Sequence, residues 1–244
     1  MDKMDQVETG QYLLCEQNRV YYILILVSGF WGAFTYLLRG HVFCNAQSGN
    51  VVLLGLAIGA GQMDQAVRYL IPMSAYVAGA FLSEILPNPV KHRLMIRWDT
   101  LLIGVEIIVV ILLGFIPDSY PVQISQIAIN FIASMQYNTF RQAQGTPMAT
   151  TFATNHIRQI GVGLAKEMLH WKKEDKGHRV KLGKHFIMLS CFLLGAIIGT
   201  ICCRLIQGRA IWVTALPLTY LFGLMIHEDK VRGKEYLEQK PSGH

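Results

Sequence analysis

Arg39-Gly-His-Val-Phe-Cys-Asn-Ala-Gln-Ser-Gly-Asn50 is a polar stretch that interrupts an otherwise apolar part of the chain. A second one, Gln144-Gly-Thr-Pro-Met-Ala-Thr-Thr-Phe-Ala-Thr-Asn155, follows 105 residues later, counted from Gly40 to Gly145. We call these stretches break 1 and break 2. Each follows a long apolar segment and precedes a shorter, less apolar one. Inside a bilayer, backbone that leaves the helix is stable only where it lines a cavity or is buried in protein. Two breaks at corresponding positions of two halves therefore predict a transport site.

The composition is typical of a membrane protein. Apolar residues make up 52% of the 244 positions and charged residues 16%, whereas soluble domains carry roughly 25% charged residues. Val20–Leu38 has 19 residues without a charge, enough to cross a hydrocarbon core of about 30 Å. Five more apolar runs are Tyr69–Leu86, Trp98–Ile116, Val122–Phe140, His185–Cys203 and Ala210–Ile226. We expect an all-α polytopic membrane protein with one transmembrane domain over 20–226, an N-terminal segment 1–19 and a C-terminal tail 227–244.

Charge, cysteines and motifs exclude several function classes. The net charge of +6 comes from basic residues that flank the apolar runs, as the positive-inside rule expects, so nucleic acid is not an expected partner. The five cysteines are odd in number, and neither a disulfide framework nor a metal site is expected. No nucleophile, metal or phosphate-loop motif is present, so we expect no enzyme activity and no cofactor. The charged residues before Val20 are mostly acidic, which argues against a cleaved signal peptide.

The segments after the two breaks decide the number of spans. Val51–Gly61 is roughly half a bilayer long at about 1.5 Å per residue, and His156–Leu164 contains a histidine and an arginine. The two segments either cross, giving eight spans, or return to the same side as half-helices, giving six. With a cytoplasmic N-terminus, six spans place 18 Lys and Arg residues inside and four outside. Eight spans place 14 inside and seven outside and leave Arg158 in the membrane. The positive-inside rule therefore favours six spans, two half-helices and two cytoplasmic termini.

Six spans divide into two repeats of three, over 20–116 and 122–226. Because each repeat has an odd number of spans, the two repeats are inverted in the membrane. Small residues support this division: Ala75-xxx-Gly79-xxx-Ser83 matches Cys191-xxx-Gly195-xxx-Gly199 at a shift of 116. Small residues at every fourth position let helices approach closely in lipid.

Both breaks lie in stretches that resemble a known family. Tyr36–Gly55 is similar to one signature of the YoaK-like family of bacterial membrane proteins, and Ser134–Arg141 with Ala149–Asn155 is similar to its second signature. The resemblance covers nearly the whole chain. It departs at Ser48, where threonine is usual, and at Thr154, where glycine is usual. The resemblance implies a multi-pass protein of the bacterial inner membrane. The family is a domain of unknown function described as a candidate transporter component, so the resemblance implies no particular substrate.

The polar side chains of the breaks are the candidate substrate-binding residues. If the chain enters each break as a loop and leaves it as a helix, the helix dipole favours an anion or a solute oxygen near the membrane midplane. The alternative is that these residues only cap the helices. The candidates are Asn45, Gln47, Ser48, Asn50, Thr150, Thr151, Thr154 and Asn155. We expect those of break 1 to approach those of break 2.

The fourth apolar run has a polar face beside this site. Its residues are Gln123, Gln126, Asn130 and Ser134, whose spacing of three and four places them on one side of a helix. Gln126 and Asn130 are further substrate-binding candidates, and hydrogen bonds between helices are the alternative. A smaller matching face on the first run consists of Ser28, Gly32 and Thr35.

Glu106 is a carboxyl group near the middle of the third run and is the candidate coupling site for a proton or cation. An ion pair with Arg141 or with a basic residue at a helix end is the alternative. His41 and His156 flank the two breaks and are expected to be hydrogen-bonding or interfacial residues. Arg39 and Arg141 precede the breaks and are expected to extend to lipid headgroups.

We therefore expect a small-solute transporter or channel. Its expected partners are the lipid bilayer and a small polar or anionic solute. The sequence leaves open whether the protein forms a homo-oligomer. The alternative is a membrane scaffold whose polar breaks are structural. An intramembrane enzyme is the weakest reading, because no acid–base or metal cluster is visible. A water-accessible cavity that reaches both breaks would favour transport, and breaks whose polar groups are all internally bonded would favour the scaffold.

The six-span arrangement predicts on which side of the membrane each loop lies. Pro87–Arg97, Ala165–Lys184 and both termini should face the cytoplasm, because this places most basic residues inside. A cysteine introduced at position 176, in a variant without the native cysteines, should react with an impermeant thiol reagent in inside-out vesicles. Reaction in intact cells would overturn the six-span arrangement.

Overall fold

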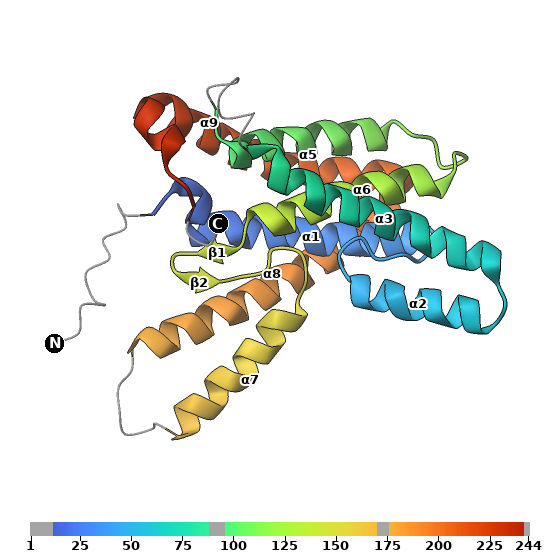
Figure 1. Cartoon of the computed structure of the whole chain (residues 1–244), viewed down its shortest axis with the longest axis horizontal. Helices are drawn as coiled ribbons and strands as arrows, with labels where there is room; N and C mark the ends of the chain where they lie inside the picture. The colour runs from blue at the N-terminus through green and yellow to red at the C-terminus, as the bar shows by residue number, and fades with distance from the viewer. Residues whose placement is uncertain (1–11, 88–95, 170–175, 242–244) are drawn as a thin grey trace.

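The computed structural model describes residues 12–87, 96–169 and 176–241, and helices dominate it (Figure 1). The long helices are α1 (Asn18–Leu38), α3 (Met63–Ile85), α5 (Trp98–Gly114), α6 (Val122–Thr139), α8 (Lys176–Ile206) and α9 (Ala215–Glu238). Shorter helices follow the breaks: α2 (Gln47–Gly59) and α7 (Thr154–Leu169). The remaining elements are the 3-10 helices η1 (Leu14–Glu16) and η2 (Gln207–Thr214) and the antiparallel pair β1 (Gln142–Ala143) and β2 (Thr146–Pro147).

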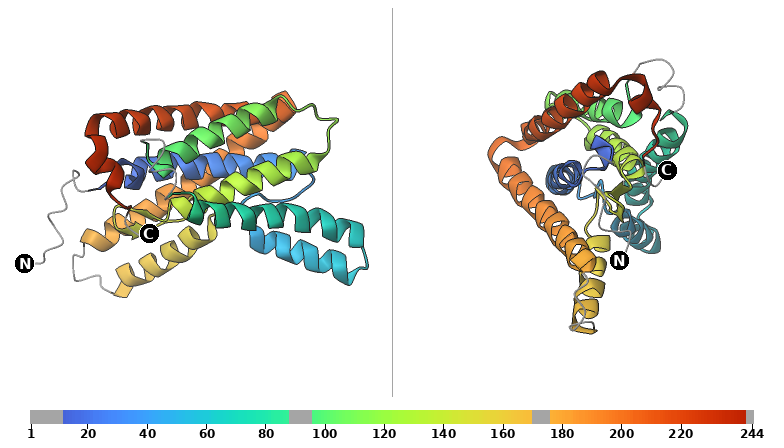
Figure 2. Two further views of the ribbon diagram at one scale, coloured as in Figure 1. Left: turned by 45° about the horizontal axis from the view of Figure 1, so that its top comes forward. Right: turned by 90° about the vertical axis from the view of Figure 1, so that its left-hand side faces the viewer.

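The long helices run roughly along the long axis of the molecule (Figure 1 and Figure 2). α1 packs along α8, α3 packs along α6, and α5 packs against α9. The shorter helices lie against the later helix of their own half, α2 on α3 and α7 on α8. α2 and α7 both start near the middle of the molecule and run toward opposite ends (Figure 1). The chain therefore re-enters the middle of the helix bundle twice, once at each break.

Large apolar side chains cover the outside of the helices as well as the core. Val77 is 69% exposed, Phe81 64% and Leu216 74%. Soluble proteins seldom expose so much contiguous apolar surface, whereas lipid tails accept it. By length and composition, the described helices contain three stretches able to cross a membrane: Asn18–Leu38, Met63–Ile85 and the continuous helical stretch Gly177–Gly233. The prediction of an all-α membrane protein is confirmed.

Five of the six predicted apolar runs coincide with helices, and the sixth needs correction. Ala210–Ile226 does not form one helix, because its first residues belong to η2 and α9 starts at Ala215. α8 ends where Gln207 adopts a left-handed φ of 50°. η2 then packs inward, with Ile211 fully buried and the Trp212 indole donating to the carbonyl of Ile111 at 2.9 Å. These tertiary contacts explain why the first residues of this apolar run form η2 and not the start of a longer α-helix.

The two small-residue ladders bring helix backbones into direct contact. A Cβ added at Gly79 would lie 2.3 Å from the carbonyl oxygen of Phe131 on α6. A Cβ added at Gly195 would lie 1.9 Å from the carbonyl oxygen of Leu26 on α1. Neither distance is compatible with any side chain, so the predicted close approach is confirmed at both glycines.

A buried charged cluster joins the N-terminal segment, the start of α5 and the end of α9. The Arg97 guanidinium donates to Asp99 at 3.0 Å and to the carbonyl of Tyr236 at 3.0 Å. The backbone N–H of Arg97 donates to Asp229 at 3.1 Å, and that of Leu14 donates to the Tyr236 hydroxyl at 3.0 Å. Burial lowers the pKa of Arg97, but the Asp99 carboxylate outweighs this and raises that pKa above its usual value. The Arg97 guanidinium is therefore charged at neutral pH, and its contacts tie the start of α5 to the end of α9.

The ladder geometry predicts which glycines tolerate a methyl group. Gly79→Ala and Gly195→Ala should each destabilise the fold by about 1–3 kcal/mol, because the methyl group forces two backbones apart. Gly223→Ala on α9 is the matched control, since no atom of the described chain lies within 4 Å of its added Cβ. It should be neutral or slightly stabilising. Thermal unfolding in detergent measures all three, and equal melting temperatures would contradict the close-packed helix pairs.

Candidate functional site

Break 1 folds back along α1 to its midpoint. Gly40 and His41 turn the chain with positive φ angles of 75° and 58°. The backbone N–H of Cys44 then donates to the Thr35 hydroxyl at 3.3 Å. One residue later, the Asn45 side chain donates to the carbonyl of Ser28 at 2.9 Å. Since Ser28 is the central residue of α1, the tip of break 1 lies halfway along that helix.

The remaining polar groups of break 1 bind other parts of the protein. The Asn50 side chain accepts from the N–H of Phe43 at 3.1 Å and donates to its carbonyl at 2.6 Å. The Gln47 side chain donates to Asn130 on α6 at 2.8 Å. The Asn130 side chain in turn donates to the carbonyl of Gln126 at 2.8 Å. Break 1 is thus closed on itself by Asn50 and tied to α6 by Gln47.

Break 2 begins with a hairpin. Gln144 and Gly145 turn between β1 and β2 with φ angles of 45° and 70°. The Tyr21 hydroxyl of α1 binds both backbone polar groups of Gln142, at 2.7 and 2.8 Å, and holds the hairpin in place. The chain then runs inward to Thr150 and Thr151, and α7 starts at Thr154, so each break leaves as a helix, as predicted.

The two threonines at the tip of break 2 have unsatisfied hydroxyl groups. Thr150 and Thr151 are fully buried, and neither hydroxyl has a hydrogen-bond partner among the residues that the structure describes. Tyr76 of α3 interacts with the Thr151 hydroxyl, but outside regular hydrogen-bond geometry. Leaving a buried polar group unpaired costs about 1–3 kcal/mol. These hydroxyls therefore form a place where water or a solute would be stabilised.

Gln136 on α6 links the two breaks. Its side-chain amide donates to the Ser28 hydroxyl at 3.2 Å and to the carbonyl of Thr150 at 3.4 Å. Asn45 of break 1 already binds the Ser28 carbonyl, so a continuous polar chain runs from Asn45 to Thr150. The side-chain oxygen of Gln136 has no partner within the described part of the chain. Ser28 and Gln136 therefore connect the tips of the two breaks at the midpoint of α1.

Three candidate residues lie away from this meeting point. Ser48 and Thr154 are exposed, and Asn155 is half-buried and accepts from Arg158 at 3.2 Å. His41 is exposed and packs edge-on against Tyr36. The structure thus brings together the inner residues of the breaks but not the first residues of α7.

Glu106 lies at the midpoint of α5 and is fully buried. Neither of its carboxyl oxygens has a hydrogen-bond partner in the described ranges. The alternative pairing with Arg141 is wrong, because Arg141 pairs with Glu84 at 2.9 Å. An ionised carboxylate in such a site would lose its hydration without compensation, so burial disfavours the charged form of the Glu106 carboxyl group.

Arg39 corrects another expectation. It does not extend to headgroups but is buried and forms an ion pair with Asp118 at 2.9 Å. It also donates to the Ser125 hydroxyl at 3.2 Å, and its guanidinium packs over the Phe34 ring. Asp118, in the loop between α5 and α6, neutralises the Arg39 guanidinium, so Arg39 does not need a lipid headgroup as its counter-charge.

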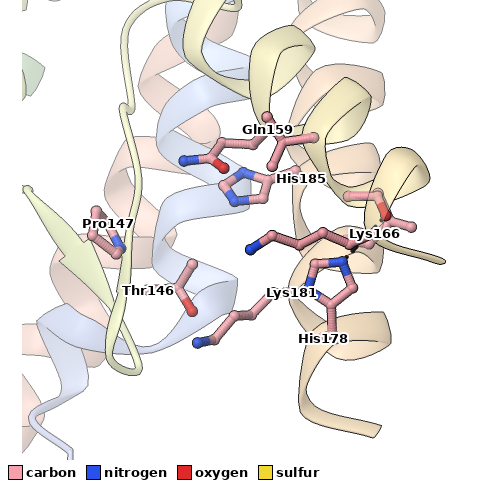
Figure 3. A pocket seen from close by; sticks show the side chains of 10 residues that line it. Thr146, Pro147, Gln159, Lys166, His178, Lys181 and His185 are labelled. Carbon is pink, nitrogen blue, oxygen red and sulfur yellow. Dashed lines mark hydrogen bonds between the residues drawn. The ribbon is translucent and has the colours of Figure 1, made fainter. Parts of the chain in front are cut away.

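Two cavities flank break 2. The α6 cavity has a volume of about 460 Å³ and the α7–α8 cavity one of about 210 Å³. The α6 cavity is lined by Tyr137, Asn138, Arg141, Pro147, Met148, Ala149, Phe152 and Asn155. The α7–α8 cavity is lined by Thr146, Pro147, Gln159, Val162, Gly163, Lys166, His178, Lys181, Leu182 and His185 (Figure 3). Both lie toward the half of the molecule that contains the hairpin.

A histidine pair connects break 2 with the α7–α8 cavity. His156 and His185 are buried, and their Nδ1 atoms are 3.0 Å apart. The Nε2 atom of His156 lies 2.8 Å from the carbonyl oxygen of Ala149. A carbonyl only accepts, so His156 carries its proton on Nε2 and accepts from Nδ1–H of His185 when both rings are neutral. His156 is therefore a buried hydrogen-bonding residue, as predicted, with a partner on α8.

Two parts of this arrangement were not predicted from the sequence. His178, Lys181 and His185 follow one another at spacings of three and four, so they share a helix face. That signal was present, but the analysis assigned these residues to a basic loop and to the start of an apolar run. Gln136 gave no signal, because it lies two positions after Ser134 and off the predicted polar face.

Comparison with known proteins identifies the family of the chain. The chain matches the family described as "Protein of unknown function (DUF1275)" over residues 20–224. It is 23% identical over 213 residues to "UPF0700 transmembrane protein YoaK" of Bacillus subtilis (strain 168), covering 86% of this chain and 93% of that protein. No solved structure matches the chain. The family match includes all of both breaks, and the chain therefore belongs to the DUF1275, or YoaK-like, family of membrane proteins.

Proposed function

We propose that the protein is a small-solute transporter of the bacterial inner membrane, and that the solute passes where the two breaks meet. One observation carries this proposal. The hydroxyls of Thr150 and Thr151 and the side-chain oxygen of Gln136 are buried without partners in the described chain, at the depth of the α1 midpoint. Lipid cannot hydrogen-bond these groups, so a polar solute or water is the natural partner.

Six membrane-crossing helices in two inverted repeats are the architecture that we propose for this transporter. Two glycine contacts support it. Gly79 meets the carbonyl of Phe131, and Gly195 meets the carbonyl of Leu26. The glycines are 116 residues apart and the carbonyls 105, the same shifts that relate the two ladders and the two breaks. α1 with α8 and α6 with α3 are therefore equivalent helix pairs. With both termini cytoplasmic, the hairpin half of the molecule faces the cytoplasm.

The two breaks differ in a way that suits a carrier. In break 1 the side chains of Asn45, Gln47 and Asn50 all have hydrogen-bond partners. In break 2 the threonine hydroxyls have none in the described chain, and both cavities lie beside it. Inverted-repeat carriers alternate access by exchanging the conformations of their repeats around a fixed site. We interpret this structure as the inward-facing state and expect break 1 to open in the other state.

Glu106 is the proposed coupling residue. A buried neutral carboxyl without a partner destabilises the fold, and leucine would fill the same space without that cost. A titratable group at the centre of α5 could take up and release a proton during the transport cycle.

A membrane scaffold is the second candidate function, because the polar side chains of break 1 are hydrogen-bonded within the protein, as a purely structural role requires.

Solvent access to break 2 distinguishes the transporter from the scaffold. In a variant without native cysteines, Thr151→Cys should react with an impermeant thiol reagent from the cytoplasmic side, because a transport path admits water. Ile129→Cys on α6 is the matched control, since Ile129 is equally buried but apolar, and it should stay unreacted. Protection of both positions from both sides would favour the scaffold.

Glu106 yields a stability prediction. Glu106→Gln should melt within a few degrees of the unmodified protein at neutral pH, because it replaces one neutral polar group by another. Glu106→Leu should be more stable by about 1–3 kcal/mol, since it removes an unpaired buried polar group. Thermal unfolding in detergent measures both. A large destabilisation by Glu106→Gln would instead reveal an ionised, paired carboxylate.

A further inference from the structure

We propose that the α7–α8 cavity is a binding site for a phosphate-class oxyanion. The site is distinct from the meeting point of the breaks, and its occupation does not depend on transport. It lies where α7 and α8 converge beside the hairpin, and α7 and α8 supply its charged groups. A free phosphate and the phosphate of a lipid headgroup share the required chemistry.

The side chains that border the cavity suit an anion. Lys166 of α7 and Lys181 of α8 extend their amino groups into the same space (Figure 3). Thr146 and Gln159 add a hydroxyl and an amide that can donate hydrogen bonds. The described lining residues include no aspartate or glutamate. Two ammonium groups and neutral donors without a carboxylate form the usual recognition chemistry of phosphate.

The surroundings add positive potential to the cavity. The Lys184 amino group, one residue before His185, lies 3.4 Å from the side-chain oxygen of Gln144. Burial and the neighbouring Lys181 ammonium lower the pKa of Lys184. The carboxylate of Glu167 on α7 is engaged by Arg179 at 3.0 Å. The Lys181 and Lys184 ammonium groups would attract a bound anion.

The histidine pair gives the site a polar wall and a link to break 2. With His185 donating from Nδ1 to His156, Nε2 of His185 is left as an acceptor. A monoprotonated phosphate carries an O–H that could donate to that atom. His156 in turn binds the carbonyl of Ala149, next to Thr150. The side chains of His185 and His156 therefore connect an anion in the cavity with the backbone of break 2.

The size of the cavity restricts the ligand. Its volume of about 210 Å³ far exceeds the roughly 10–15 Å³ that one water needs. It is below the roughly 300 Å³ at which pockets for drug-sized ligands begin. A compact oxyanion or a single headgroup phosphate fits this volume.

Isothermal titration of the full-length protein tests this proposal. The protein is placed in phosphatidylcholine nanodiscs, and inorganic phosphate is added with chloride balancing the ionic strength. Saturable binding is expected. Lys181→Gln should weaken it by about tenfold, the effect of losing one charge-assisted contact. Lys181→Arg should retain it. Lys230→Gln, an exposed lysine on α9 outside the cavity, is the matched control and should bind as the unmodified protein does.

A second arm identifies the source of the phosphate group. Nanodiscs of mixed phosphatidylcholine and phosphatidylglycerol are analysed for lipid that copurifies with the protein. No binding of inorganic phosphate, together with phosphatidylglycerol enrichment that Lys181→Gln abolishes, would support the proposal with a headgroup as ligand. Lys166→Gln replaces Lys181→Gln if the latter fails to fold in a melting assay. Absence of both kinds of binding, or equal weakening by Lys230→Gln, would overturn the site.

Discussion

A bilayer offers no water to backbone groups that leave a helix, and both breaks of this protein depend on how that constraint is met. In break 1 a side chain takes the place of water. The Asn50 amide binds the N–H and the carbonyl of Phe43 at once, as a neighbouring strand would. In break 2 the backbone pairs with itself in the β1–β2 hairpin, and Tyr21 secures the hairpin to α1. The backbone of break 1 is thus satisfied by a side chain and that of break 2 by a hairpin. Both breaks extend to the midpoint of α1.

The helix pairs around the breaks make this depth possible. Because Gly195 and Gly79 let α8 and α3 touch the backbones of α1 and α6, the four helices form a rigid frame. α1 and α6 then present Ser28 and Gln136 toward the space between them, where both breaks find hydrogen-bond partners. A looser frame would leave those partners out of reach, and the exposed loops would become unstable in lipid.

Much of this fold could be predicted from the sequence, because helices, breaks and small-residue ladders are local patterns. The site was predicted less well. Asn50 and Asn155 occupy equivalent positions in the two breaks, yet Asn50 is buried and Asn155 binds Arg158 at a half-exposed position. The hairpin explains the difference. Its strands supply hydrogen bonds to the backbone of break 2, so the Asn155 side chain is not needed for this purpose. The pairing of Arg39 with Asp118 and of His156 with His185 also depends on contacts far apart in the chain, which no local pattern reveals.

The difference between the breaks has an energetic meaning. Break 1 is bonded, whereas break 2 holds two buried hydroxyls without partners in the described chain, each unfavourable by about 1–3 kcal/mol. That free energy is available to any solute that bonds both hydroxyls, and it favours solutes with several oxygen atoms over apolar ones. A solute bound there also contacts the region that Gln136 joins to Ser28, and so touches both halves of the molecule.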